Sequence, residues 1–135
     1  MPSVLFVCVK NGGKSQIAAS LMRMKEGINV HSCGTKPAGE LNALAVESLA
    51  EVGGSVEGEH PKGLDPAVVS SVDRVVILGE EADPGLFADA KQVDVWVTDE
   101  PSLRGIEGME RMRLVRDDIA RRVDSLYAEM TGESA

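Results

Sequence analysis

The residues best suited to chemistry in this 135-residue chain lie close to its N-terminus. Cys8 is followed by the glycine-containing run 9–13 and then by Lys14 and Ser15. A thiolate is a strong nucleophile, and a nearby cation or helix N-terminus favours the thiolate over the thiol. Backbone N–H groups of a glycine-rich loop can converge on one anion, and a helix starting there adds its positive end. The pattern predicts an oxyanion-binding loop with Cys8 as its nucleophile.

Each residue of this loop has an expected role. Lys14 supplies a positive charge, and Ser15 caps the following helix or donates a hydrogen bond to the Cys8 sulfur. Asn11 tolerates left-handed backbone angles, so we expect it to shape the loop rather than to react. The loop is not a Walker A motif, because Cys8 stands where that motif needs its first glycine. The expected oxyanion-binding residues are Val9, Lys10, Asn11, Gly12, Gly13 and Lys14.

Strands and helices alternate around this loop. Short apolar runs rich in β-branched residues predict buried strands, and apolar residues three or four apart predict helices. The expected strands span 3–9, 28–33, 73–78 and 92–97, the expected helices span 15–26, 41–52, 64–71 and 109–130, and 131–135 is expected to be a frayed tail. This order predicts an α/β three-layer sandwich in which helices flank a four-stranded parallel sheet. Ligands of such sheets bind beyond the carboxyl ends of the strands, where the loop after Cys8 lies.

Composition limits the functions open to the chain. Its length fits a single domain over 1–135. A net charge of −8 and an aromatic content of 3% disfavour nucleic-acid binding, which needs basic surfaces or stacking rings. Neither a signal peptide nor an apolar run of membrane-spanning length is evident, so we expect a cytoplasmic protein with no membrane partner. No Cys/His pair has metal-ligand spacing, so no metal is expected.

Several motifs resemble one known family. The Cys-x5-cation-Ser pattern after VLFVCV is similar to the low-molecular-weight protein tyrosine phosphatases and to the thiol-dependent arsenate reductases of the same fold. Residues 15–18 resemble the SQMA run of those reductases, 30–35 resemble the SAGT segment, and 98–101 resemble the acidic Asp-Pro loop. The NGGKSQ sequence resembles most closely the actinobacterial arsenate–mycothiol transferases. The resemblance extends from Val4 to about Leu126.

Three departures from the family pattern affect the expected chemistry. Lys14 replaces the family arginine, which keeps the charge but loses the bidentate fork. Thioredoxin-coupled reductases carry two further cysteines after the third strand, whereas 79–91 contains none, so an outside thiol must complete the reduction. The family aspartate directly precedes proline, but here Glu100 does so and Asp99 comes before it. Either carboxyl can serve as the general acid, and alignment favours Glu100.

The resemblance implies an arsenate reductase of the thiol-transferase type. Lys14 and the loop amides would hold arsenate while Cys8 attacks or polarises the arsenic. A low-molecular-weight thiol, mycothiol by resemblance, would take the arsenic as a thiol–arsenate adduct. Mycoredoxin or another glutaredoxin-like protein would then release arsenite, with no tightly bound cofactor. Two alternatives are a phosphotyrosine phosphatase, which the missing arginine and the lack of aromatics after Pro101 disfavour, and a non-catalytic oxyanion sensor.

Other candidate residues are assigned structural roles. We expect Cys33 to be buried rather than to act as a resolving thiol, and His31 to be structural. His60 either bonds to the loop or lies on the surface. The charged run 111–122 can bind an acidic cofactor or partner, but a solvated helix face with i,i+4 pairs explains it more simply.

Overall fold

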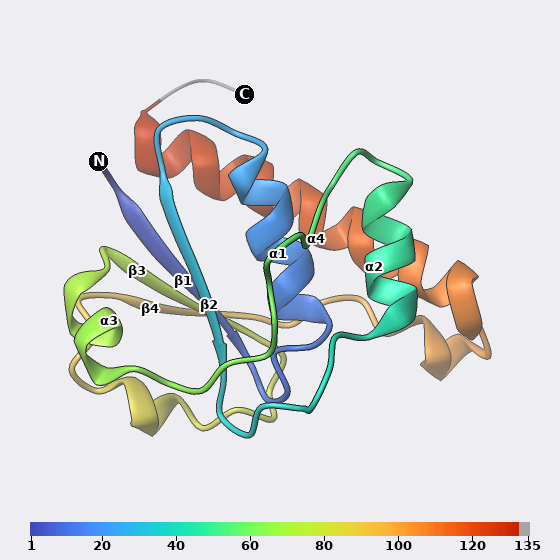
Figure 1. Ribbon diagram of the computed structural model, residues 1–135, viewed down its shortest axis with the longest axis horizontal. Coiled ribbons are helices and arrows are strands. Elements are labelled where there is room, and N and C mark those ends of the chain that lie inside the picture. The colour runs from blue at the N-terminus through green and yellow to red at the C-terminus, as the bar shows by residue number, and fades with distance from the viewer. Residues whose placement is uncertain (133–135) are drawn as a thin grey trace.

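One parallel sheet forms the centre of the structure, a computed structural model that describes residues 1–132 (Figure 1). Its strands are β1 (Ser3–Cys8), β2 (Asn29–Gly34), β3 (Arg74–Leu78) and β4 (Val93–Trp96). All pairings are parallel and the spatial order is β2-β1-β3-β4. The predicted four-stranded parallel sheet is therefore confirmed, and its carboxyl ends share one edge.

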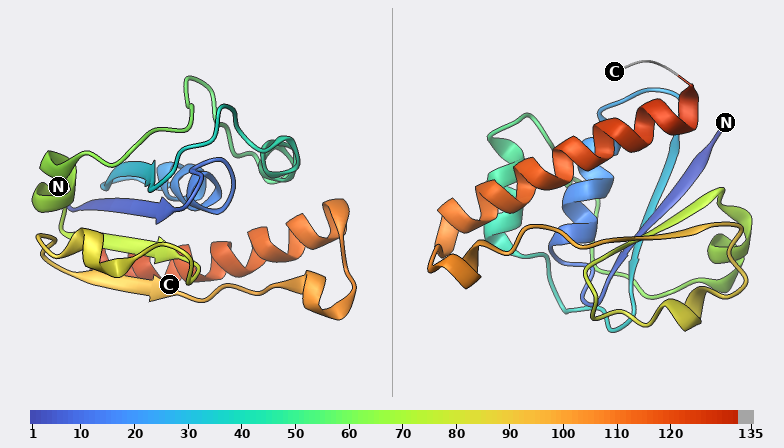
Figure 2. Two further views of the ribbon diagram at one scale, coloured as in Figure 1. Left: turned by 90° about the horizontal axis from the view of Figure 1, so that it is seen from below. Right: turned by 180° about the vertical axis from the view of Figure 1, so that it is seen from behind.

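Helical segments cover both faces of the sheet (Figure 2). They are α1 (Lys14–Arg23), α2 (Ala43–Ala50), α3 (Pro66–Ser71), α4 (Gly108–Thr131) and the 3-10 turns η1 (Pro84–Phe87) and η2 (Pro101–Arg104). One face packs against α1 and α4, and α2 packs in turn against these two helices. The other face packs against α3 and η1. The predicted three-layer α/β sandwich is confirmed.

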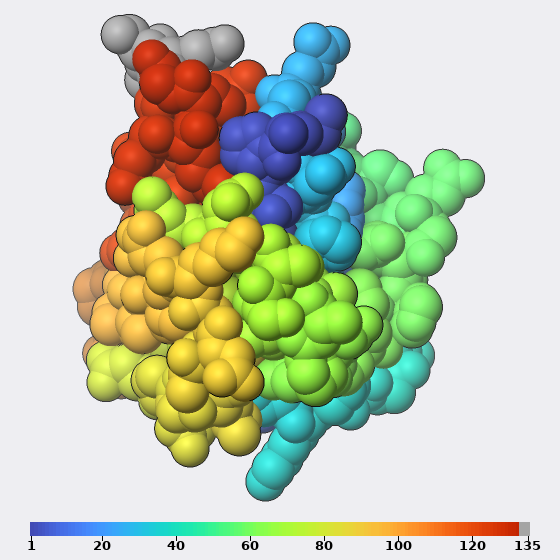
Figure 3. Space-filling view, turned by 90° about the vertical axis from the view of Figure 1, so that its left-hand side faces the viewer, coloured from blue at the N-terminus to red at the C-terminus, as the bar shows by residue number. Residues whose placement is uncertain are grey.

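Side chains of β1 alternate between the two hydrophobic cores, as the two-residue period of a strand requires. Val4 and Phe6 pack with residues of α1 and α4, whereas Leu5 and Val7 pack with residues of α3 and η1. The apolar run of β1 is thus buried on both faces, as predicted. Figure 3 shows the second of these layers from outside, with α3 in light green beside the yellow and orange chain around η1 and β4.

Helix caps place the element boundaries a few residues from the expected ones. α2 begins at Ala43 because the Asn42 side chain accepts a hydrogen bond from the Ala45 N–H at 3.0 Å. α3 begins at Pro66 because Asp65 accepts from the Ala67 N–H, also at 3.0 Å. Side-chain caps of this kind compete with apolar periodicity in setting where a helix starts.

The C-terminal helix runs longer than expected. α4 continues through Thr131, whose hydroxyl donates to the Tyr127 carbonyl at 2.7 Å, and Gly132 ends it with a φ of 74°. The prediction of a frayed tail is therefore wrong at Thr131, while 133–135 lie outside the described residues. Within residues 1–132, no helix is both long and apolar enough to cross a membrane.

Candidate active site

The loop 9–13 leaves the carboxyl end of β1, an inner strand of the sheet, and enters α1. Cys8 is the last residue of β1 and lies in register with Gly34 of β2. The first hydrogen bond of the helix runs from the Ile17 N–H to the Gly13 carbonyl at 2.9 Å. Strand and helix therefore bring the thiol and the positive helix end to one place.

Two donors converge on the Cys8 sulfur. The Asn11 N–H donates to Sγ at 3.2 Å, and the Ser15 hydroxyl lies 2.9 Å from it. The Asn11 side-chain amide donates to Ser15 Oγ at 2.7 Å, so the hydroxyl acts as acceptor there and is free to direct its own proton to Sγ. A thiolate at Cys8 would accept both hydrogen bonds, and donors to a charged acceptor stabilise it.

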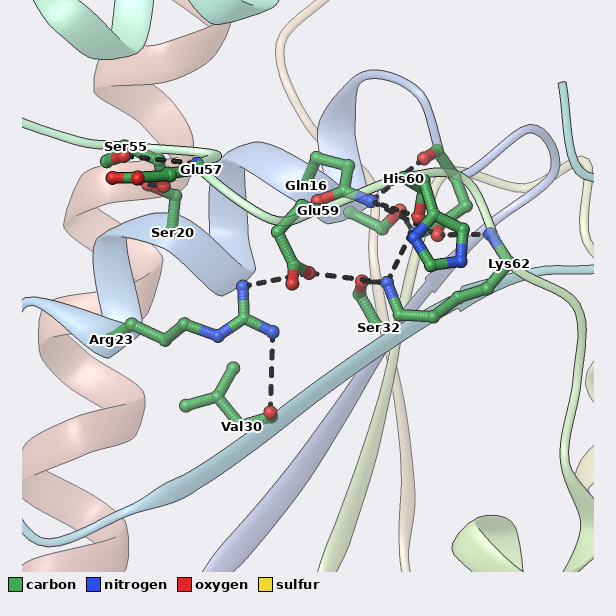
Figure 4. A network of polar contacts seen from close by, with 12 residues as sticks. Gln16, Ser20, Arg23, Val30, Ser32, Ser55, Glu57, Glu59, His60 and Lys62 are labelled. Carbon is green, nitrogen blue, oxygen red and sulfur yellow. Dashed lines mark hydrogen bonds and ion pairs between the residues drawn. The ribbon is translucent and has the colours of Figure 1, made fainter. Parts of the chain in front are cut away.

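Asn11 holds the shape of the loop. It is fully buried, and at a φ of 53° it is the one described non-glycine residue in the left-handed region. Its Oδ1 accepts from the Lys62 N–H at 3.0 Å and from Gln16 Nε2 at 3.2 Å, while its carbonyl accepts from the same Gln16 nitrogen at 3.1 Å. Figure 4 shows Gln16 of α1 and Lys62 of the 55–63 segment within one network of polar contacts. Helix and segment together fix a conformation that Asn adopts more readily than most residues.

The carbonyl groups of Cys8 and of the loop bond to the chain that follows β2. The bonds join the Thr35 N–H to Cys8 O, Lys36 to Val9 O, Ala38 to Lys10 O and Asn42 to Gly12 O, at 2.8 to 3.2 Å. Because N–H and C=O of a trans peptide point in opposite directions, the intervening loop N–H groups face the other way. This orientation suits an anion on the side of Cys8.

Gly34 permits this close approach of β2 to the loop. A Cβ at this position would lie 2.6 Å from the Val9 carbonyl oxygen and 2.9 Å from Asn11 Cβ. Both contacts involve the loop itself rather than the end of a flexible side chain. A side chain here would displace the loop that carries the thiol.

Beside the loop, two cations share one carboxylate. Arg111 of α4 donates to Glu100 from Nε at 2.8 Å and from a terminal guanidinium nitrogen at 3.1 Å. Ser102 donates to the same carboxylate at 2.6 Å, and Lys14 Nζ lies 3.9 Å from it. The bonds from Arg111, then that from Ser102, lower the pKa of Glu100 to about 2. Glu100 is therefore ionised at neutral pH.

Asp99, the alternative acid, has a different partner. Its carboxylate accepts two hydrogen bonds from Arg104, at 2.8 and 3.1 Å, and these lower its pKa. Glu100 lines the pocket that contains Cys8, whereas Asp99 does not. The structure thus places Glu100, not Asp99, in the same pocket as the thiol, and it holds both acids as carboxylates without a proton to donate.

One cavity of about 770 Å³ joins Cys8, Lys14, Glu100 and Arg111. Of the predicted oxyanion-binding residues, Val9, Lys10, Gly12, Gly13 and Lys14 line it, while Asn11 is buried behind them. Among the described residues, none in this lining is aromatic. A water molecule takes about 30 Å³ in the liquid, so a tetrahedral oxyanion fills a small part of this volume and leaves room for a second ligand.

The remaining cysteine and histidines lie outside the pocket lining. Cys33 is 3% exposed in β2, and burial, followed by the charge of Cys8, raises its thiol pKa to about 11. His60 approaches the loop through its backbone carbonyl, which accepts from Gln16 Nε2 at 3.4 Å (Figure 4). His31 is exposed on β2.

Sequence reasoning missed the role of two arginines in 111–122. Arg111 lines the pocket, and Arg116 is 9% exposed and donates to the Ser48 carbonyl and to Glu51. The expectation of a uniformly solvated helix face is wrong at these positions. No local pattern links Arg111 to Lys14, because the two residues are far apart in sequence and share a pocket only in the folded chain.

Fold and site together define an α/β protein with a cysteine in a pocket at the carboxyl end of its parallel sheet. Residues 3–134 match the model of a family described as low molecular weight phosphotyrosine protein phosphatase, and the chain belongs to this family. The resemblance inferred from the loop is confirmed.

Relatives with similar sequences include named arsenate reductases. The chain is 32% identical over 133 residues to a putative arsenate reductase of Halobacterium salinarum, with 92% of this chain and 89% of the relative covered. It is 30% identical over 126 residues to an arsenate reductase of Bacillus cereus, covering 90% of each chain.

Solved structures share the fold. A thioredoxin-dependent arsenate reductase of Corynebacterium glutamicum has a TM-score of 0.78 and 29% identity, covering 99% of this chain. This chain spans 64% of the length of that protein. An arsenate reductase in its phosphate-binding state has a TM-score of 0.82 and 26% identity, covering 96% of this chain and 99% of that one. The YwlE arginine phosphatase, at 19% identity and a TM-score of 0.77, shares the fold.

Proposed function

We propose that this protein reduces arsenate with the help of an external thiol. The observation that carries the proposal is the Cys8 sulfur with two hydrogen-bond donors, in a pocket where the predicted general acid, Glu100, is held ionised. A phosphatase needs a proton donor for its phenolate leaving group. Arsenate carries hydroxyl groups of its own, so oxygen can leave as water with a proton from the substrate. The named arsenate reductases among the relatives support the same assignment.

In the first step, the amides of the loop and Lys14 hold arsenate against Cys8. The thiolate attacks arsenic, a sulfur–arsenic bond forms, and an arsenic–oxygen bond breaks with release of water. The second proton of that water comes from another hydroxyl group of the arsenate, because Glu100 and Asp99, the predicted general acids, are held as carboxylates. Arsenic stays pentavalent in this step, and the enzyme carries a Cys8–arsenate adduct.

In the second step, an external thiol attacks the arsenic and displaces Cys8 as a thiolate. The product is a free thiol–arsenate adduct, which is why we call the protein a transferase. A redoxin thiol then attacks the sulfur of this adduct, the sulfur–arsenic bond breaks, and its electron pair reduces arsenic to arsenite. The two thiols supply the two electrons and end as a mixed disulfide.

The thiol we propose is mycothiol, with mycoredoxin or a glutaredoxin-like protein as the reductant. The run 79–91 contains no cysteine, and the raised pKa of Cys33 disfavours it as an internal thiolate. Leu41 and Leu44 line the pocket together with Glu40 and Glu81, which supports an uncharged thiol over one that bears carboxylates. Such thiols are abundant in a reducing cytoplasm, where we place the protein.

Arsenite production tests the proposal. The purified protein, arsenate and mycothiol with mycoredoxin should yield arsenite, and Cys8→Ser should abolish it. A parallel assay with thioredoxin in place of mycothiol and mycoredoxin shows which of the two systems is the reductant. Hydrolysis of p-nitrophenyl phosphate with arsenate acting only as an inhibitor would favour the phosphatase, and anion binding without either reaction would favour the sensor.

A further inference from the structure

The loop contains one side-chain cation at its end, Lys14, where the family pattern has an arginine. An ammonium group is a point charge, whereas a guanidinium binds an oxyanion through two parallel N–H bonds. The pocket nevertheless contains a guanidinium, because α4 places Arg111 in its wall.

Arg111 is oriented for two-point binding. Its guanidinium donates to both oxygens of Glu100, and among the described residues this carboxylate is the only hydrogen-bond acceptor of the guanidinium. The bonds come from Nε and one terminal nitrogen, which leaves the second terminal nitrogen without an acceptor in the described chain. Arg111 therefore has donors available on a pocket wall that also contains Cys8.

Glu100 interacts with both cations, Lys14 and Arg111, at the same time. Lys14 lies 3.9 Å from one oxygen of the carboxylate that Arg111 binds at two points. The side chains of Glu100 and Arg111 are each 31% exposed, so water can replace their mutual contacts at modest cost. A divalent oxyanion in the pocket would attract the two cations more strongly than the single charge of Glu100 does.

We propose that Arg111 is a second cationic ligand of the bound oxyanion and supplies the fork that Lys14 lacks. Glu100 is the internal carboxylate that holds the two cations in place until the oxyanion displaces it. The assignment of this anion as arsenate rests on the proposed function, whereas the binding geometry applies to any tetrahedral oxyanion.

The chain offers a matched control for Arg111. Arg113 lies on the same helix and makes a comparable two-point contact, from Nε and a terminal nitrogen to Glu51. Arg113 does not line the pocket. Arg113→Gln therefore removes a similar ion pair from α4 without removing a proposed ligand.

Calorimetric titration with inorganic phosphate at pH 7.5 tests the proposal on the full chain. Arg111→Gln should weaken phosphate binding about tenfold, because it removes a hydrogen-bond donor to a charged group. Glu100→Gln should tighten binding roughly two- to fivefold, since a competing exposed anion is removed. Arg113→Gln should leave the dissociation constant unchanged, and the midpoint of thermal unfolding identifies any variant that has lost its fold.

A double variant separates direct binding from an indirect role. If Arg111 binds the oxyanion, Arg111→Gln weakens binding about tenfold also in the Glu100→Gln background. If Arg111 only restrains Glu100, the substitution has no effect once that carboxylate is gone, and this result would overturn the proposal. Lys14→Arg, which restores a fork to the loop, should recover most of the affinity lost in Arg111→Gln.

Steady-state kinetics with arsenate distinguishes this proposal from the proposed function. Arg111→Gln should raise KM about tenfold with a smaller change in kcat. If no variant reduces arsenate but the phosphate titrations follow the pattern above, the reductase assignment fails and the role of Arg111 stands. If arsenate is reduced but the double variant shows no loss of affinity, the role of Arg111 fails and the reductase assignment stands.

Discussion

Removal of the Ser15 hydroxyl should slow the reaction of Cys8 with an electrophile. The hydroxyl lies 2.9 Å from Sγ and is oriented by the Asn11 amide at 2.7 Å, so it can donate to a thiolate. A hydrogen bond to a charged group contributes about 1.5–3 kcal/mol. Since about 1.4 kcal/mol corresponds to tenfold, Ser15→Ala should slow the alkylation of Cys8 roughly tenfold to a hundredfold.

Alkylation by iodoacetamide at pH 7, followed by intact-protein mass spectrometry, measures this effect. The buried Cys33 reports on unfolding, because it reacts only if the core opens. Ser20→Ala is the matched control, since Ser20 is also buried on α1 but donates to the Ser55 carbonyl at 3.0 Å. Equal alkylation rates of Cys8 in Ser15→Ala and the unmodified protein would refute the reasoning that Ser15 stabilises the thiolate.

Three further predictions follow from contacts around the site and on α4. Gly34→Ala should abolish arsenate reduction and weaken phosphate binding in calorimetry, because its Cβ would lie 2.6 Å from the Val9 carbonyl; unchanged binding would contradict this. Arg113 and Arg116 hold the pKa of Glu51 at about 2, below its usual 4.5. Stability from this carboxylate is thus present above about pH 4.5 and lost as pH falls toward 2. Between pH 4.5 and pH 2, the free energy of unfolding in urea should fall less in Glu51→Gln than in the unmodified protein. If the free energy of unfolding falls equally with pH in both proteins, the ion pairs of Glu51 with Arg113 and Arg116 do not contribute to stability. Among small thiols, uncharged 2-mercaptoethanol should support faster arsenate reduction than anionic 3-mercaptopropionate, because Glu40 and Glu81 line the pocket. The double substitution Glu40→Gln with Glu81→Gln should reduce the difference between the two rates. Faster reduction with the anionic thiol would contradict the preference for an uncharged thiol.

The sequence was sufficient to predict the fold because its signals are local. The β-branched run of β1, the glycines after it and the apolar periodicity of α1 and α4 each lie within one element. The sheet and its parallel sense follow from their alternation. The predicted helix starts were less accurate, because single side-chain hydrogen bonds of Asn42 and Asp65 set where α2 and α3 begin.

Only the part of the pocket that is formed by residues contiguous in sequence could be predicted. The thiol and the loop are contiguous in sequence, and they lie together in the structure. Arg111 and Gly34 act through chain segments that are distant in sequence, so no spacing pattern reveals them. Glu100 is ionised because Arg111 donates hydrogen bonds to it. Since this contact between distant residues is not visible in the sequence, the sequence analysis treated Glu100 as a protonated acid.

Mass spectrometry of the thiol–arsenate adduct tests the central claim most directly. The protein is incubated anaerobically with arsenate and mycothiol, without a redoxin, and the small molecules are analysed. We predict a mycothiol–arsenate adduct that forms with the unmodified protein and not with Cys8→Ser. Equal adduct formation in both samples, or a mycothiol disulfide on Cys8 with arsenite already released, would contradict the transfer mechanism.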